Sequence, residues 1–132
     1  MVEATSAIAS FIAVVDDDIR VLESLESLLE SAGYEVAVFS SGDSFLRSEA
    51  VSTVNCVVTD IRMPNIGGLE LQRRLKRQRP ELPIIFITAH HDERDEQRAV
   101  EEGAAGFLRK SFSALEFLGA LRRALGKLTV EQ

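Results

Sequence analysis

The sequence is short of cysteine, proline and glycine. It has one cysteine, three prolines and eight glycines in 132 residues, of which 45% are hydrophobic and 27% charged. One cysteine excludes an internal disulfide and a cysteine-based zinc cluster, and the apolar surroundings of Cys56 are typical of a small buried residue. The proportions of hydrophobic, charged, glycine and proline residues also exclude a disordered or fibrous chain. The length predicts a single domain spanning 1–132, with a core at about 11–126 and short tails.

Basic residues are in the minority. The chain has 15 Lys and Arg against 21 Asp and Glu, a formal net charge of −6, which argues against binding nucleic acid through a basic surface of its own. The apolar stretch 7–15 near the start is too short to span a bilayer, and Glu3 stands before it in place of a basic segment. We therefore expect a cytoplasmic protein that binds neither nucleic acid nor membrane.

Short β-branched runs alternate with helical patterns along the whole chain. Most of these runs are continuously apolar, which is typical of strands buried on both faces. Five strand-then-helix units in succession predict an α/β fold, a doubly wound parallel sheet with right-handed crossovers and helices on both faces. The predicted strands are 11–15, 34–39, 54–59, 83–88 and 106–109.

Two of the predicted helices have distinctive patterns. The last one begins at a capping box of Ser113 and Glu116, with Phe112 and Phe117 placed to form a hydrophobic staple. The segment 92–102 carries few apolar side chains. We expect the helix there to be the least firmly held, and therefore a candidate for movement.

Polar residues end or follow the predicted strands. Ligands of an open parallel sheet bind beyond the carboxyl ends of its strands. The aspartate run 16–18 follows the first strand and Asp60 follows the third, while the fourth ends in Thr88 and the fifth is followed by Lys110. We therefore expect several carboxylates, one hydroxyl and one ammonium to converge at one edge of the sheet.

Such a group of carboxylates restricts the chemistry of the site. Two like charges about 4 Å apart repel by roughly 4 kcal/mol, so either pKa values rise or a cation joins them. Oxygen ligands without histidine or cysteine favour Mg²⁺. Lys110 would then face a phosphoryl oxygen, and the hydroxyl of Thr88 would donate a hydrogen bond. Asp60 would be the nucleophile that forms an acyl phosphate. Asp18 most simply caps the first helix.

Four motifs stand in order along the chain. They are VVDDD at 14–18, TDIRMP at 59–64, ITA at 87–89 and FLRK at 107–110. Together they resemble the receiver domain of two-component response regulators, and the resemblance extends from Phe11 to Leu125. It implies a flavodoxin-like five-stranded sheet with strand order 2-1-3-4-5. It also implies a signalling domain, not an enzyme, that assists its own phosphorylation and dephosphorylation.

The resemblance implies a role for each residue at this edge. A sensor histidine kinase would phosphorylate Asp60, with Mg²⁺ as the cofactor. Asp17 would bind the metal directly and Asp16 mainly through water, while Asp60 and the backbone carbonyl of Arg62 would complete the protein ligands. Lys110 would contact the phosphoryl group.

The resemblance also implies a switch and a set of partners. Thr88 and Phe107 resemble the pair that reorients after phosphorylation and alters the surface of the fourth helix, fifth strand and fifth helix. Arg62 and His90 occupy the two variable positions that tune the lifetime of the acyl phosphate, although the simpler interpretation of His90 and His91 is a pair of exposed loop residues. The implied partners are the kinase and a downstream effector or output domain outside this chain, for example a DNA-binding one. Homodimerisation on phosphorylation stays open, since many relatives dimerise in that state.

One position departs from the family pattern. Ser111 follows Lys110 where relatives usually have proline, often after a cis bond. Because a cis bond before a non-proline residue costs about 3 kcal/mol, we expect a trans bond here. We also expect the loop 110–112 to differ from the family geometry and the lysine to be aimed differently.

Two other hypotheses remain open. A haloacid-dehalogenase-like phosphatase would use Asp16 and Asp18. Against it, Arg20 occupies the position where that motif has Thr or Val, and no late acidic motif is present. An interaction domain that works without phosphorylation would keep the pocket as a relic, and the departure at Ser111 is its support.

Overall fold

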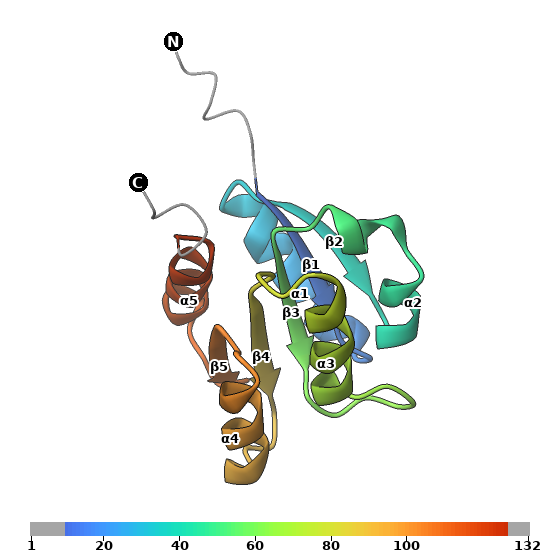
Figure 1. Ribbon diagram of the computed structural model, residues 1–132. Coiled ribbons are helices and arrows are strands. Elements are labelled where there is room, and N and C mark those ends of the chain that lie inside the picture. The colour runs from blue at the N-terminus through green and yellow to red at the C-terminus, as the bar shows by residue number, and fades with distance from the viewer. Residues whose placement is uncertain (1–9, 127–132) are drawn as a thin grey trace.

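The computed structural model describes residues 10–126. Its five strands form one parallel sheet in the order β2-β1-β3-β4-β5, with helices packed on both faces (Figure 1). The predicted doubly wound α/β fold and its strand order are confirmed. Along the chain the elements are β1 (Phe11–Val15), α1 (Ile19–Ser31), β2 (Glu35–Phe39), α2 (Gly42–Leu46), a 3-10 helix η2 (Glu49–Ser52), β3 (Cys56–Asp60), α3 (Gly68–Gln78), β4 (Ile84–Thr88), α4 (Glu93–Glu101), β5 (Gly106–Arg109) and α5 (Ala114–Gly126).

The central strands β1, β3 and β4 are buried because most of their side chains are apolar, with polar residues only at the carboxyl ends of β3 and β4. Every residue of β3 and β4 is buried, whereas the edge strands β2 and β5 are mostly half-buried. Cys56, at the start of β3, is among the buried residues, and burial raises the pKa of its thiol to about 12. The thiol therefore stays protonated at neutral pH, as expected of a structural cysteine.

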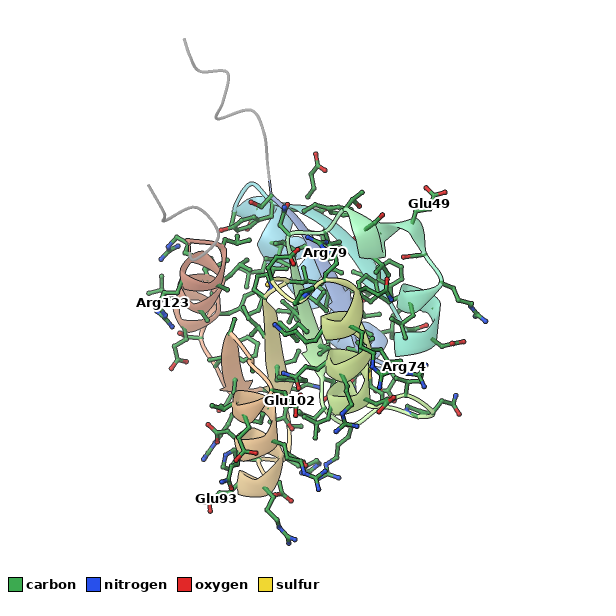
Figure 2. The ribbon with its side chains drawn as sticks, viewed as in Figure 1. Glu49, Arg74, Arg79, Glu93, Glu102 and Arg123 are labelled. Carbon is green, nitrogen blue, oxygen red and sulfur yellow. The ribbon has the colours of Figure 1, made fainter. Side chains whose placement is uncertain are left out.

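Two apolar cores lie on opposite faces of the sheet, because successive side chains of a strand point to opposite sides. The core that contains Val58 includes buried residues of α1 and α5, and the core that contains Val57 includes buried residues of α2, α3 and α4. Charged side chains such as Glu93 and Arg123 project outward from the helices (Figure 2). Within residues 10–126, no helix combines the length and the apolarity that crossing a membrane requires.

Strands β2 and β3 begin later than predicted, because preceding turns use their backbone amides. The amide of Tyr34 donates to the carbonyl of Leu29 (3.0 Å), which closes the end of α1. The amide of Val54 donates to the carbonyl of Ala50 (2.9 Å), which closes the 3-10 turn. At its other end β3 includes Asp60, so this aspartate belongs to the strand and is held by the sheet.

The capping box and the hydrophobic staple predicted for α5 are confirmed. The amide of Ser113 donates to Oε1 of Glu116 (2.7 Å), and the amide of Glu116 donates to Oγ of Ser113 (3.1 Å). The rings of Phe112 and Phe117 stack with their centroids 5.4 Å apart. These contacts fix the chain between β5 and α5, two residues after Lys110.

Helix α4 has one buried residue, Ala99, whereas α5 has four. Nε2 of Gln72 on α3 donates to the carbonyl oxygen of Ala99 (3.1 Å), which fixes the C-terminal part of α4. The low burial predicted for this helix is confirmed. Its movement stays a prediction.

Candidate functional site

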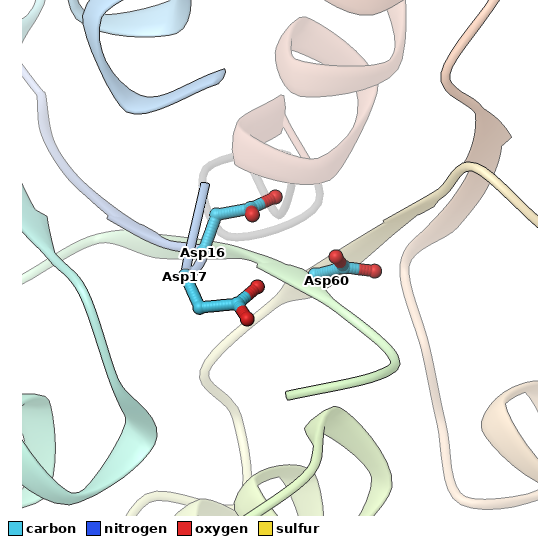
Figure 3. A group of neighbouring side chains, drawn as sticks. All are labelled: Asp16, Asp17 and Asp60. Atoms are coloured by element: carbon cyan, nitrogen blue, oxygen red, sulfur yellow. The ribbon is translucent and has the colours of Figure 1, made fainter. Parts of the chain in front are cut away.

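Three aspartates meet at the carboxyl end of the sheet. Asp16 and Asp17 follow β1, and Asp60 ends β3. The two strands are neighbours, with Val15 opposite Thr59. One carboxylate oxygen from each aspartate lies within 4.8 Å of the other two, and Figure 3 shows the three side chains together at this edge. The structure thus brings together the carboxylates that the sequence placed at strand ends.

Lys110 supplies the positive charge of the site. Its Nζ lies 3.1 Å from Oδ2 of Asp60 and 3.1 Å from Oδ2 of Asp16. Its backbone amide donates to the carbonyl of Thr88 (2.7 Å), which anchors the residue to the end of β4. None of the peptide bonds among residues 10–126 is cis, so the predicted trans bond before Ser111 is confirmed. With this trans bond the lysine still points into the site.

The carboxylate of Asp60 is held from two sides. Oδ1 accepts hydrogen bonds from the amides of Ile61 (2.7 Å) and Arg62 (3.4 Å), while Oδ2 accepts from Lys110 (3.1 Å). Only 8% of the residue is exposed. The carboxylate therefore has a fixed orientation at the edge of the sheet.

A glycine allows the loop after Asp60 to fold back onto the strand. A Cβ atom at Gly68 would lie 2.2 Å from the carbonyl oxygen of Asp60, which no side chain can occupy, and the amide of Gly68 donates to the carbonyl of Ile61 (2.8 Å). Gly68 is not among the site residues predicted from the sequence. Its signal is the Gly67–Gly68 pair directly before a helical leucine pattern.

Asp16 and Asp17 sit in opposite environments. Asp16 is fully buried, and burial raises the pKa of its carboxyl group, although the hydrogen bond from the amide of Asp18 (2.9 Å) and the nearby ammonium of Lys110 oppose the rise. Asp17 is exposed. Burial alone would lower the pKa of Lys110, but the hydrogen bond to Asp60 and the close carboxylate of Asp16 outweigh it, so the pKa is raised. The ammonium is therefore charged at neutral pH.

The residues present fit a hard divalent cation. Oδ2 of Asp16 is buried and, among the described residues, has no hydrogen-bond partner of good geometry, although Nζ of Lys110 lies 3.1 Å away. This oxygen therefore has capacity left to bind a cation. Exposed Asp17 leaves one side of the cluster accessible to water. An all-oxygen donor set of this kind suits Mg²⁺, which binds few protein ligands and keeps several waters. The Arg62 carbonyl stays a predicted ligand.

Thr88 ends β4 and folds its side chain back onto its own loop. The hydroxyl donates to the carbonyl of His90 (3.0 Å) and accepts from the amide of His90 (3.2 Å). Ile87 pairs with Asp60 across the sheet, so Thr88 lies one residue beyond the level of that aspartate. Its hydroxyl is therefore close to the site and engaged with the loop.

Phe107 lies between the sheet and a histidine. Its ring centroid is 6.1 Å from that of Phe86 and 6.1 Å from that of His91, which it meets edge to face. The imidazole of His91 also contacts Oε1 of Glu96 (2.5 Å) and Nη2 of Arg109 (3.3 Å). The expectation that His91 is an exposed loop residue is wrong, because these contacts from α4 and β5 partly bury it.

Two other candidates stay outside the cluster. His90 is exposed, as the simpler interpretation expected. Asp18 caps α1, since its Oδ1 accepts from the amide of Arg20 (3.0 Å), and this hydrogen bond lowers the pKa of its carboxyl group. Its capping role weighs against a phosphatase that pairs Asp16 with Asp18.

Comparison with known proteins gives one family. A sequence model of the response regulator receiver domain matches residues 12–122. The response regulator protein TodT of Pseudomonas putida is 44% identical over 124 residues, which cover 94% of this chain and 54% of TodT. The chain thus spans about half the length of such full-length relatives.

Solved structures with the same fold point to the same family. A response regulator receiver domain from Clostridium thermocellum aligns with a TM-score of 0.87 and 31% identity, over 93% of this chain and 99% of that one. The BeF3-activated receiver domain of DrrB aligns with a TM-score of 0.81 and 31% identity, over 89% of this chain and 98% of that one. The chain belongs to the response regulator receiver domain family.

Proposed function

We propose that this domain accepts a phosphoryl group on Asp60 from a phosphohistidine of a sensor histidine kinase, in a reaction that depends on Mg²⁺. The observation that carries the proposal is the placement of Lys110, whose ammonium lies 3.1 Å from Asp60 at the rim of a three-carboxylate cluster. A nucleophilic carboxylate beside a cation site and a fixed ammonium is what phosphoryl transfer requires.

The chain's own residues supply the chemistry of transfer. An oxygen of Asp60 forms the new bond to phosphorus while the bond from phosphorus to the imidazole nitrogen breaks, and the imidazole keeps the electron pair. Amides of Ile61 and Arg62 orient the carboxylate for this attack. Bound Mg²⁺ would neutralise charge on the phosphoryl oxygens. Lys110 supplies a second positive charge at the site.

A groove beside Lys110 offers the donor a place to dock. It has a volume of about 650 Å³ and is lined by α1, the end of β4 and the loop between β5 and α5. Several of its lining residues are apolar, among them Leu25, Ile87 and Phe112. An amphipathic helix carrying the phosphohistidine would bury its apolar side there and present the phosphoryl group to Asp60.

Transfer would be followed by a switch at Thr88. The threonine hydroxyl has one proton, which is now donated to the carbonyl of His90, so a hydrogen bond to a phosphoryl oxygen requires that this bond break. The loop between β4 and α4 would then be released from the end of the sheet. Phe107 would turn inward, and the surface of α4, β5 and α5 would change.

The names of the relatives support an output domain or effector as a partner of this domain. TodT is named a response regulator protein, and a FixJ relative is named a transcriptional regulatory protein. We propose that this chain acts in the cytoplasm and controls an output domain or effector outside it. Dimerisation on phosphorylation stays a prediction.

The test is labelling with acetyl phosphate and Mg²⁺, followed by mass spectrometry. We expect one added phosphoryl group, lost in Asp60→Asn and strongly reduced in Asp17→Asn, while the control Asp18→Asn keeps it because Asp18 only caps α1. Absence of labelling, together with no transfer from a phosphorylated kinase, would favour the phosphorylation-independent interaction domain. Turnover of a phosphomonoester that depends on Asp16 would favour the phosphatase.

A further inference from the structure

An arginine two residues after Asp60 reaches across to helix α4. Nη2 of Arg62 lies 3.0 Å from Oδ2 of Asp95, to which it donates a hydrogen bond, and 3.8 Å from Oδ2 of Asp92. The partners are 33 positions apart in the sequence. They meet because the loop after β3 and the start of α4 lie at the same end of the sheet (Figure 1).

The same arginine belongs to the phosphorylation site through its backbone. Its amide points at Oδ1 of Asp60 at 3.4 Å, beside the shorter hydrogen bond from Ile61. Two residues span at most about 7 Å of chain, so a group attached to Asp60 comes within range of the long, flexible side chain of Arg62. The guanidinium thus has anionic partners on α4, and a phosphoryl group on Asp60 would bring a second set within reach.

Helix α4 is held differently at its two ends. Near the C-terminal end, Ala99 is buried and accepts a hydrogen bond from Gln72. The N-terminal end has no buried residue, and its first turn contains three acidic side chains beyond the capping Asp92. Arg62 brings a positive charge to this acidic end from another element. Loss of that contact would loosen the start of α4 while Ala99 stays in place as a pivot.

We propose that Arg62 is a positioning residue that links α4 to the phosphorylation state of Asp60, an inference that rests on the proposed function. In the unmodified protein its guanidinium holds the start of α4 through Asp95 and Asp92. A phosphoryl group on Asp60 draws the guanidinium away, and the start of α4 is released.

The physical reason is competition for one cation. Phosphorylation adds roughly one negative charge at Asp60 and three acceptor oxygens, and a guanidinium binds phosphate through two parallel hydrogen bonds. The competing pair with Asp95 is weak, because 60% of the Arg62 side chain is exposed to solvent. The phosphoryl group is therefore the stronger partner.

The test is hydrogen exchange of the start of α4, followed by mass spectrometry of a peptide covering 92–98. The states are the unmodified domain, the domain with Mg²⁺ alone, and the domain with Mg²⁺ and BeF3⁻ in place of a phosphoryl group. The variants are Arg62→Gln, Asp95→Asn and the double variant, and Asp92 is left intact because it caps α4. The matched control is Arg47→Gln, which removes an exposed Arg–Asp pair on α2 (3.2 Å).

In the unmodified domain we expect each single variant to raise exchange about 1.5- to 5-fold, the range of exposed ion pairs. The double variant should raise it no further, and Arg47→Gln should leave it unchanged. Wild type with Mg²⁺ and BeF3⁻ should reach the level of the variants, while Arg62→Gln with BeF3⁻ should show no additional rise.

Three results would overturn the inference: unchanged exchange in Arg62→Gln, additive effects of the two substitutions, or an equal BeF3⁻ response with and without the arginine. The phosphoryl group on Asp60 is measured separately, from the added mass after acetyl phosphate. A domain that is phosphorylated but shows no role for Arg62 in α4 contradicts this inference alone. A domain that takes up no phosphoryl group contradicts the proposed function instead.

Discussion

The ammonium of Lys110 lies 3.1 Å from a carboxylate oxygen of Asp16, a residue with no exposed surface. The same ammonium lies 3.1 Å from Oδ2 of Asp60, so one positive charge is shared between two carboxylates. Burial raises the pKa of Asp16 in spite of this partner. A negative charge on Asp16 therefore costs stability in the folded state, and a bound cation would offset that cost.

The first prediction concerns stability and pH in the presence of a metal chelator. Because the pKa of Asp16 is raised in the folded state, the folded protein binds its proton more tightly than the unfolded chain does. The charge of Asp16 therefore lowers the free energy of unfolding progressively as pH rises from 3.8 through the raised pKa. We expect Asp16→Asn to unfold at higher urea concentration than wild type at pH 7, with a difference that shrinks toward pH 4.

Asp18→Asn is the matched control for this prediction. A hydrogen bond from the amide of Arg20 lowers the pKa of Asp18, so the ionised form stabilises the folded state above pH 3.8, and this contribution disappears as pH falls through the lowered pKa. The control should therefore show the opposite trend with pH. A difference between Asp16→Asn and wild type that does not change with pH would contradict the argument.

The second prediction compares two helical glycines. Gly68→Ala should destabilise the domain by about 1–3 kcal/mol, because its Cβ would lie 2.2 Å from the carbonyl oxygen of Asp60 and the backbone would have to shift. Gly119→Ala in α5 meets only the end of Arg123 at 3.5 Å. It should stabilise the domain by about 0.5–1 kcal/mol, since alanine favours a helix. Urea denaturation measures both, and equal effects would contradict the steric argument.

The backbone arrangement of the site could be predicted from the sequence for two reasons. The apolar pattern of each strand is local in sequence, and a parallel doubly wound sheet allows few arrangements of its strands. Mainly apolar runs predicted β1, β3 and β4, and the carboxyl ends of parallel strands share one edge. Asp16, Asp60 and Lys110 therefore had to approach one another. The boundaries of β2 and β3 were less predictable, because a backbone amide at the start of a strand can donate either across the sheet or within the preceding turn. The amide of Val54 donates within the turn.

Contacts between distant side chains could not be predicted in this way. Arg62 and Asp95 are 33 positions apart, and neither lies in a strand, so no periodicity relates them. His91 resembles any loop histidine until the sheet brings Arg109 and Phe107 to its side. These contacts depend on side-chain directions that the strand order does not determine.

The third prediction concerns Mg²⁺ and stability. A ligand that binds only the folded state stabilises it by about 2.7 kcal/mol at a concentration one hundred times its Kd. We expect Mg²⁺ to raise the midpoint of thermal unfolding in wild type, and the rise to vanish in Asp17→Asn. Asp18→Asn should keep the rise, because Asp18 is outside the cluster of carboxylates. An equal rise in Asp17→Asn would place the ion elsewhere.

The fourth prediction separates phosphorylation from the switch, and it concerns Thr88. Thr88→Val keeps the shape of the side chain but removes the hydroxyl that donates to His90 (3.0 Å) and accepts from its amide (3.2 Å). With two hydrogen bonds lost, the domain should be destabilised by about 1–2 kcal/mol. Asp60 and Lys110 are untouched, so labelling by acetyl phosphate should persist.

The effect of the same substitution on the surface around β5 should be larger than its effect on labelling. In wild type we expect amide NMR shifts in 104–109 to change on addition of Mg²⁺ and BeF3⁻, because Thr88 leaves His90 and Phe107 turns. Thr88→Val should bind BeF3⁻ without this change, and Thr88→Ser, which keeps a hydroxyl, should restore it. If Thr88→Val shows the full wild-type response, the hydroxyl does not transmit the signal and the transition must start elsewhere at the site.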